Sequence, residues 1–269
     1  MVLLLARKGE SKMKKGISQE GLKLIACLTM LIDHIGYELI SPLCCNAVIS
    51  GSVTFLAAED LHRLYYLCRC VGRIALPIFA FLIVEGVHRT RNRKQYALRL
   101  ALGTLIAEIP YDLMVMGEFV GNKQSVMVTL LLGFCAVLAM EKCAALAWKP
   151  VVVIPFAVLA ELLNGDYGWS GVVLVALFEL SRYTPRRNLV RFCGMLVLGH
   201  YASGMILELG NFTIPIQALA ALSMFFIGAY DGRKLTKSKT AQWAFYLFYP
   251  VHMLILWFIG TLLPAGIAL

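Results

Sequence analysis

The chain has 269 residues, of which 59% are hydrophobic and 15% are charged, and its mean hydropathy is +0.75. A water-soluble domain of this composition would expose large apolar patches, so the composition argues against a soluble protein and favours a membrane protein. The formal net charge of +9 does not indicate nucleic-acid binding, because the basic residues lie in short runs between apolar blocks.

The apolar blocks have the length of helices that cross a bilayer, roughly 18–22 residues, and they lack the alternation of a β-barrel. We therefore predict an all-α, polytopic transmembrane helical bundle of about nine spans. The predicted spans are Leu22–Ile40, Tyr65–Val87, Tyr96–Met116, Val126–Ala147, Val151–Leu163, Trp169–Arg182, Leu189–Ile206, Phe212–Tyr230 and Ala241–Leu263. Residues 1–16 are expected to be a flexible basic arm, residues 17–269 a single transmembrane domain, and residues 41–64 an extramembrane or re-entrant segment.

The charges of the loops alternate along the chain. Clusters of lysine and arginine precede the first predicted span and follow the second, fourth, sixth and eighth, whereas the other loops carry acidic residues and few bases. Basic loops of helical membrane proteins stay on the cytoplasmic side. The alternation therefore predicts a cytoplasmic N-terminus and, with nine spans, a C-terminus outside.

Two histidines lie deep within predicted spans. The first span contains Asp33 and His34 side by side in "LTMLIDHIGYELI", and the last contains Tyr249 and His252 in "YPVHM". An ionisable side chain inside a membrane is costly and usually serves a function. Histidine takes up and releases a proton near neutral pH, and both histidines fall at a similar depth. We expect the two imidazoles to line one polar cavity with their rings within about 12 Å of each other.

Three further ionisable residues, Arg73, Glu108 and Asp166, lie within or beside the predicted spans. In a structural interpretation, Arg73 forms an ion pair with Glu108 or with Asp112 and holds two helices together. In the same interpretation, the neighbouring Arg69 also pairs with Glu108 or Asp112. Asp166 also fits a solvated carboxylate at the end of a loop. In a functional interpretation, these side chains surround the histidines.

Six motifs occur in order along the chain. They are "LKLIACLTMLIDHIG", "GRIALPIFAFLIVEGVHRTRNRKQYALRL", "EIPYDL", "QSVMVTLLLG", "DYGWSGVVLV" and "FYLFYPVHMLIL". Together they resemble the TraX family over roughly residues 17–260. One departure is Ser125 in "QSVMVTL", where the family more often has asparagine.

The resemblance implies a multi-pass protein of the bacterial inner membrane. The family's namesake is linked to N-terminal acetylation of conjugative pilin, and the family looks related to membrane acyltransferases that use cytosolic acetyl-CoA. A membrane acetyltransferase is therefore expected, surrounded by lipid, with acetyl-CoA as donor and a pilin-like peptide or a surface glycan as acceptor. A role in conjugation is not specified by the resemblance.

The expected donor site is a basic girdle on the cytoplasmic side. Arginine suits phosphate because its planar fork donates two hydrogen bonds at once. The candidates are Arg89, Arg91, Arg93 and Lys94, with Arg186 and Arg187 as a second group.

In the expected reaction, His34 removes a proton from the acceptor as a general base, and an acetyl-histidine intermediate is the alternative. Asp33 is about 100° around the helix from His34, so Glu108 or Asp166 is the better candidate to orient the imidazole. Arg73 is the candidate for stabilising the oxyanion. Tyr249 and His252 are expected to hold the acceptor or to shuttle its proton.

Two other functions fit the same residues. The chain is either a proton-coupled transporter, in which Asp33, His34 and Glu108 relay protons, or a non-catalytic assembly protein for pili or surface polymers. A donor tunnel open to the cytoplasm would favour the enzyme over the transporter. No metal site is predicted, because the cysteines show no metal-type CxxC pair.

Overall fold

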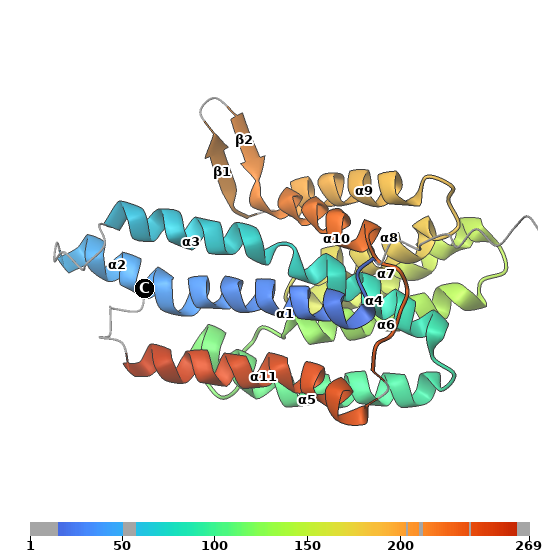
Figure 1. The fold of residues 1–269 in the computed structure, drawn as a ribbon, viewed down its shortest axis with the longest axis horizontal. Helices are drawn as coiled ribbons and strands as arrows, with labels where there is room; N and C mark the ends of the chain where they lie inside the picture. Colours follow the sequence, from blue (N-terminus) through green and yellow to red (C-terminus); the bar gives the residue numbers. More distant parts are fainter. Residues whose placement is uncertain (1–15, 51–57, 203, 210–211, 237, 263–269) are drawn as a thin grey trace, which may run out of the picture.

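The structure is a computed structural model that describes residues 16–50, 58–202, 204–209, 212–236 and 238–262. Residues 1–15 of the predicted N-terminal arm lie outside the described residues. The described chain is mostly helical, with one small β-hairpin and short π or 3-10 segments labelled η (Figure 1). The elements are α1 (Gln19–Ile35), η1 (Gly36–Ile40), α2 (Ser41–Ser50), α3 (Ala58–Gly72), α4 (Ala75–Arg89), α5 (Arg93–Met116), α6 (Val126–Lys142), η2 (Leu146–Trp148), α7 (Lys149–Leu162), α8 (Gly168–Ser181), α9 (Arg187–Tyr201), β1 (Ile206–Leu209), β2 (Phe212–Pro215), η3 (Ile216–Ser223), α10 (Met224–Gly228) and α11 (Lys239–Leu262).

The first helix is longer than predicted. The hydroxyl of Ser18 caps its start by accepting a hydrogen bond from the Gly21 amide, at 3.1 Å. Helix α1 then continues without a break through the π-helical η1 into α2. Residues 41–50 are therefore helical, and the first helix that is apolar enough to cross a membrane extends to Cys45, five residues beyond the predicted end of the first span.

The second predicted span is divided into two helices at Arg73 and Ile74. Proline cannot donate a backbone hydrogen bond, and its ring clashes with the carbonyl group four residues earlier. Pro77 stands four residues after Arg73, so it favours the end of α3 at this point. The amide of Arg73 bonds instead to the carbonyl of Cys70, at 3.3 Å. The break places the side chain of Arg73 at the junction of α3 and α4.

Helices α1 and α3 approach each other closely at two glycines. A Cβ atom at Gly72 would lie 2.2 Å from Oδ1 of Asp33, and one at Gly36 would lie 2.6 Å from Cβ of Cys68. Neither distance is compatible with a real side chain. The absence of side chains at these two positions therefore lets α3 contact α1 directly beside Asp33.

Helix α4 is the centre of the bundle. It packs against α1, α6, α8 and η3, and Ile78, Ala80 and Val87 have no exposed surface. Helices α5 and α11 form a pair along one side, and α9 lies on the opposite side with the β-hairpin beside it (Figure 1). Helix α1 lies between α3 and the outer pair (Figure 1).

The predicted eighth span is wrong in its first part. Residues 212–215 form strand β2, which pairs antiparallel with β1. An apolar helix begins only at Ile216, and it is 3-10 helix as far as Ser223. The seventh predicted span also ends early, at Tyr201, because the following residues enter the hairpin.

Among the described residues, three helical stretches, each with any short break or π-helical turn included, are long and apolar enough to cross a membrane. They cover Gln19–Cys45, Ala58–Arg89 and Thr240–Leu262. Large apolar side chains on the outer helices, such as Leu105, Ile109 and Phe258, are exposed, as expected for contact with lipid. These features identify the described chain as a helical membrane protein.

Candidate active site

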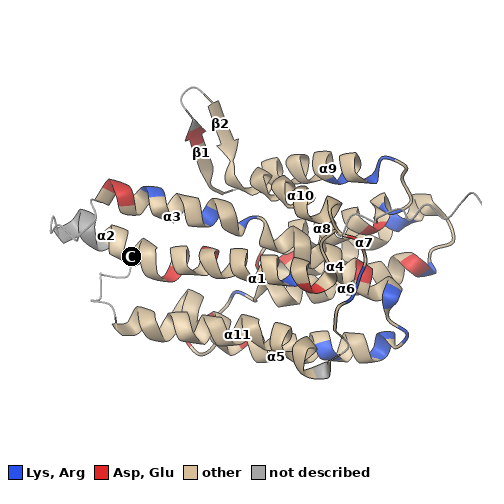
Figure 2. Ribbon diagram, viewed as in Figure 1, with Lys and Arg blue, Asp and Glu red and all other residues tan. Residues whose placement is uncertain are grey.

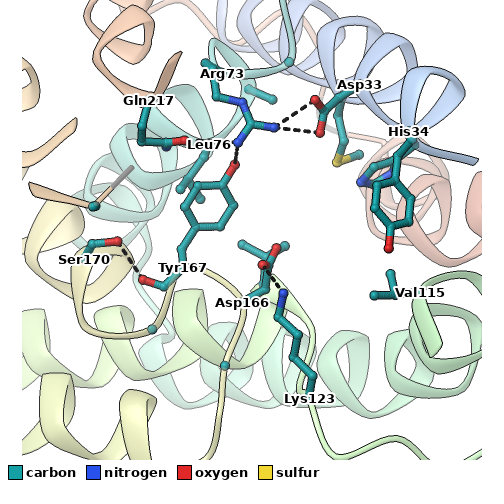
Figure 3. A pocket seen from close by; sticks show the side chains of 18 of the residues that line it. Asp33, His34, Arg73, Leu76, Val115, Lys123, Asp166, Tyr167, Ser170 and Gln217 are labelled. Atoms are coloured by element: carbon teal, nitrogen blue, oxygen red, sulfur yellow. Dashed lines mark hydrogen bonds and ion pairs between the residues drawn. The ribbon is translucent and has the colours of Figure 1, made fainter. Parts of the chain in front are cut away.

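A polar cavity of about 490 Å³ lies among α1, α3, α4, α5 and the loop before α8 (Figure 3). Asp33, His34, Arg73, Asp166 and Tyr249 line it, together with apolar side chains. Five of the seven residues expected to take part in catalysis therefore border one space. Among the described residues, no group of three or more His, Cys, Asp or Glu side chains is arranged to hold a metal ion.

His34 and His252 form a hydrogen-bonded pair. Nδ1 of His34 lies 2.6 Å from Nε2 of His252, and the ring centroids are 4.9 Å apart. The expectation that the two rings lie close together is confirmed. The arrangement differs in one respect, because His34 lines the cavity whereas His252 is buried behind it.

The hydrogen bonds determine which nitrogen of each neutral imidazole carries the proton. Nδ1 of His252 lies 2.6 Å from the carbonyl oxygen of Phe248, which can only accept, so this nitrogen donates. Nε2 of His252 must then accept from Nδ1 of His34. Nε2 of His34 is left with its lone pair, which is the state that a general base requires.

Tyr249 packs against both histidines. Its ring centroid is 6.2 Å from that of His34 and 5.8 Å from that of His252, with edge-on geometry in both contacts. Helix α11 runs through Pro250 without an assigned break, so residues three apart stay on one face. The tyrosine and its helix therefore fix the position of the imidazole pair.

Asp33 binds two arginines, one within α3 and one directly after its last residue. Its carboxylate accepts a hydrogen bond from Nη1 of Arg69, at 2.9 Å. It also accepts two from Nη2 of Arg73, at 2.8 and 3.0 Å, which Figure 3 shows. The prediction that these arginines pair with Glu108 or Asp112 is therefore wrong. The closeness of α1 and α3 at Gly72 brings the aspartate to them instead.

Arg73 makes five hydrogen bonds, as many as a guanidinium has N–H groups. Besides the two to Asp33, Nε donates to the carbonyl of Arg69, and Nη1 donates to the hydroxyl of Tyr167, at 2.9 Å, and to Oε1 of Gln217, at 3.0 Å. The guanidinium is thus committed to the protein. This argues against the expectation that Arg73 itself binds the oxyanion.

The sequence alone gave Tyr167 and Gln217 no role in the site. They approach Arg73 from the loop before α8 and from η3, more than 90 residues further along the chain. Tyr167 also has a positive φ of 62°, which is uncommon for a residue other than glycine. The motif "DYGWSG" was the available signal, since it places a tyrosine between two turn-forming residues.

Neither carboxylate expected to orient His34 contacts it. Glu108 accepts hydrogen bonds from the hydroxyl and the amide of Ser125, at 2.6 and 3.1 Å, at the start of α6. Asp166 pairs with Lys123, at 3.1 Å, on the cavity wall (Figure 3). The prediction that Glu108 or Asp166 orients the imidazole of His34 is therefore wrong. His252 lies beside His34 instead. Ser125, the departure from the family pattern, anchors Glu108.

A second cavity of about 320 Å³ adjoins the first. Both are lined by the same side chains at their common boundary, namely Met30, Phe79, Val126, Leu130 and Tyr249. The far end of the second cavity is formed where α1, α5 and α11 begin and α4 ends. Its described lining contains the basic residues Lys23, Arg89, Arg99 and Lys234 and no acidic residue.

Of the six basic residues that were expected to bind a donor, only Arg89 lines this cavity within the described chain. Arg89 also donates to Glu85, at 2.8 Å. Arg93 binds Glu141 on the surface. The others, Arg91, Lys94, Arg186 and Arg187, are exposed and lie outside the described linings of both cavities. The unpredicted Arg99 has a buried Nε with no hydrogen-bond partner among the described residues.

These features define a helical membrane protein with a histidine pair at the wall of an internal polar cavity. Comparison with known families identifies it further: the TraX protein family matches residues 18–260, and the chain belongs to that family. It is also 28% identical to the probable fimbrial assembly protein FimC, serogroup H1, of Dichelobacter nodosus, over 87% of this chain and 92% of that protein. No solved structure matches significantly.

Proposed function

We propose that the chain is an integral membrane acyltransferase. It transfers an acetyl group from cytosolic acetyl-CoA to an amine or hydroxyl group of a membrane-associated or extracytoplasmic acceptor. The observation that carries this proposal is the His34–His252 pair, which leaves a lone pair on Nε2 of His34 at the wall of a polar cavity. General-base catalysis by a positioned histidine requires this arrangement.

His34 acts as the general base in this proposal. Its Nε2 takes the proton from the acceptor as the acceptor attacks the thioester carbonyl carbon. His252 accepts the hydrogen bond from Nδ1 of His34 and so holds the ring and its tautomer. The proton on Nε2 then passes to the departing thiolate. Direct transfer of this kind needs no covalent enzyme intermediate, although an acetyl-histidine remains the alternative.

The second cavity is the proposed route of the donor. Its basic end attracts the phosphates of acetyl-CoA through Lys23, Arg99 and Lys234, and its apolar wall suits an extended pantetheine arm. The side chains shared by both cavities lead from that end to His34. This arrangement supports a donor that enters from the basic end and an acceptor that enters through the polar cavity.

The same arrangement supports one orientation in the membrane. Lys and Arg gather at the end of the bundle where α4 ends and α5 and α11 begin (Figure 2). By the positive-inside rule this end faces the cytoplasm of the proposed bacterial inner membrane, so the N-terminus is cytoplasmic. The polar cavity then opens toward the outer half, where Lys123, Asp166 and Trp169 line it.

Two acceptors are proposed, a pilin-like peptide and a surface glycan. The similarity to a protein named for fimbrial assembly favours a role in pilus biogenesis. The same similarity favours a second candidate, a pilus-assembly protein without catalysis. A proton-coupled transporter is less well supported, because Asp33 is bound to arginines and Glu108 to Ser125, so the three expected relay groups are not connected.

The test uses the purified full chain in lipid with labelled acetyl-CoA, a peptide with a free N-terminus and an oligosaccharide. Release of the CoA thiol and incorporation of the label are both measured. We expect transfer by the wild type and a loss of at least about 100-fold in His34→Gln, with unchanged thermal stability. Full activity of His34→Gln would contradict the proposed base. Absence of transfer by the wild type, with intact binding to pilin, would favour the assembly protein.

A further inference from the structure

We propose that the hydroxyl of Tyr167 is a catalytic hydrogen-bond donor that stabilises the oxyanion of the acyl-transfer reaction. This inference rests on the proposed function and assigns a role that the sequence had assigned to Arg73. It follows from the direction of one hydrogen bond, from the backbone that holds the tyrosine, and from the position of the ring in the cavity.

The bond between Arg73 and Tyr167 leaves the tyrosine proton unused. A guanidinium has donors and no acceptor, so Nη1 of Arg73 donates and the phenolic oxygen accepts, at 2.9 Å. The tyrosine O–H must therefore point elsewhere. Among the described residues it has no other hydrogen-bond partner, and Tyr167 lines the cavity that His34 also lines. The O–H is available to a molecule in that cavity.

Arg73 makes this hydroxyl a stronger donor. A cationic group that donates to a phenolic oxygen draws electron density from it and strengthens the hydrogen bond that its O–H can give. The guanidinium centre also lies 5.8 Å from the ring centroid of Tyr167. Because Asp33 and Gln217 hold the guanidinium as well, its position does not depend on the substrate.

The backbone of Tyr167 is held in an unusual conformation. Its φ of 62° is uncommon for a residue with a side chain, and such conformations gather at functional sites. Its carbonyl accepts hydrogen bonds from the hydroxyl of Ser170, at 2.7 Å, and from the amide of Gly171, at 3.1 Å. The preceding carbonyl, of Asp166, accepts from Thr129, at 2.6 Å. These contacts fix the ring before any substrate binds.

The ring is placed opposite the proposed base. Figure 3 shows Tyr167 and His34 on two sides of the open cavity, with Asp33 and Arg73 along the wall between them. A thioester carbonyl between the two side chains can meet the base on one side and the hydroxyl on the other. This is the arrangement that a tetrahedral intermediate requires.

Nε2 of His34 takes a proton from the acceptor while the acceptor's nitrogen or oxygen forms a bond to the carbonyl carbon. The π-electrons of the carbonyl move to its oxygen, which accepts the hydrogen bond from Tyr167. When the carbonyl re-forms, the C–S bond breaks and the thiolate takes the proton from His34. Tyr167 keeps its own proton throughout, so it stabilises charge and does not transfer a proton.

The test compares Tyr167→Phe with Gln217→Leu. Each variant removes one hydrogen bond from Nη1 of Arg73, but only the first removes a hydroxyl that can donate to the oxyanion. We expect Tyr167→Phe to lower kcat by about 100-fold and to leave KM for acetyl-CoA and the melting temperature nearly unchanged. Gln217→Leu should lower kcat by less than about tenfold.

Equal losses of kcat in the two variants would overturn the inference, because they would show that Tyr167 only positions Arg73. A fully active Tyr167→Phe beside an inactive His34→Gln would also overturn it, while leaving the proposed function intact. A wild-type chain that transfers no acetyl group would instead contradict the proposed function, and the inference with it. The thermal measurement identifies a variant that has merely unfolded.

Discussion

At the scale of single residues, Asp33 and His34 are neighbours in sequence but serve different partners. They project about 100° apart around α1, so one faces α3 and the other faces α11. The carboxylate of Asp33 neutralises the charge of two guanidinium groups, while the imidazole of His34 forms a hydrogen bond with that of His252. The cost of burying two ionisable residues in one helix is therefore offset by two separate sets of contacts.

The ion pairs of Asp33 predict that it stabilises the fold. Its side chain is 12% exposed and that of Arg73 is 10% exposed, so the ion pair is largely buried. Asp33→Asn leaves the guanidinium groups without a counter-charge, and we expect it to destabilise the fold by about 3–5 kcal/mol. Thermal unfolding in detergent measures the loss.

The matched control is Asp60→Asn, which changes a carboxylate that is 54% exposed and pairs with Arg63 on the same helix. Exposed pairs of this kind contribute about 0–1 kcal/mol. If Asp33→Asn melted at the same temperature as Asp60→Asn, the buried cluster would not stabilise the helix contact.

The sequence predicted part of the site at this scale. The proximity of His34 and His252 could be predicted, because both histidines lie at a similar depth in predicted spans. The partners of Asp33 could not, because they depend on how closely α1 and α3 approach and on where α3 ends. The contact of Tyr167 with Arg73 could not be predicted for a similar reason, because the backbone of Tyr167 has an unusual conformation.

At the scale of elements, the junction of α3 and α4 determines the geometry of the site. Pro77 favours the break, Gly72 allows the close contact, and Arg73 lies between them. Its Nε donates to the carbonyl of Arg69, one turn back along α3, and this bond ties the side chain to the end of the helix. A continuous helix would direct the guanidinium differently.

The close contact makes a clear prediction for Gly72→Ala. The added Cβ would lie 2.2 to 2.3 Å from three atoms of Asp33, so α3 must move away from α1. We expect a loss of stability of about 1–3 kcal/mol or more, together with lower transfer activity. Thermal unfolding and the transfer assay measure the two effects.

Gly228→Ala is the control for that experiment. Its Cβ would meet only one atom within 4 Å, Nδ2 of Asn188 at 3.9 Å, and alanine favours a helix more than glycine does. The control should be as stable as the wild type. Equal stability of Gly72→Ala would mean that the two helices are not in contact as described.

Hydropathy predicted most helices but not their ends. Helix α5, at Arg93–Met116, and α11, at Lys239–Leu262, lie close to the predicted spans. Residues 212–215 were misassigned, because a short apolar run fits a buried helix and a strand equally well. The helix over residues 41–50 was missed because Pro42 and Asn46 resemble a break between helices.

At the scale of the whole molecule, two cavities follow one another along the bundle. One has a basic end and an apolar wall, the other is polar and bordered by His34, and they meet at shared side chains. The clustering of basic loops at one end was predictable from their alternation in the sequence (Figure 2). The cavities were not, because they depend on how several helices pack.

The central claim is that acetyl passes from a donor on the basic, cytoplasmic side to an acceptor beyond His34. The most direct measurement adds labelled acetyl-CoA, which is too polar to cross a bilayer, to bacterial membrane vesicles of known orientation that contain the wild type or His34→Gln. Inverted vesicles expose the cytoplasmic side. We predict that they incorporate label only with the wild type, and that right-side-out vesicles do not. Incorporation by right-side-out vesicles, or equal incorporation with His34→Gln, would contradict the account.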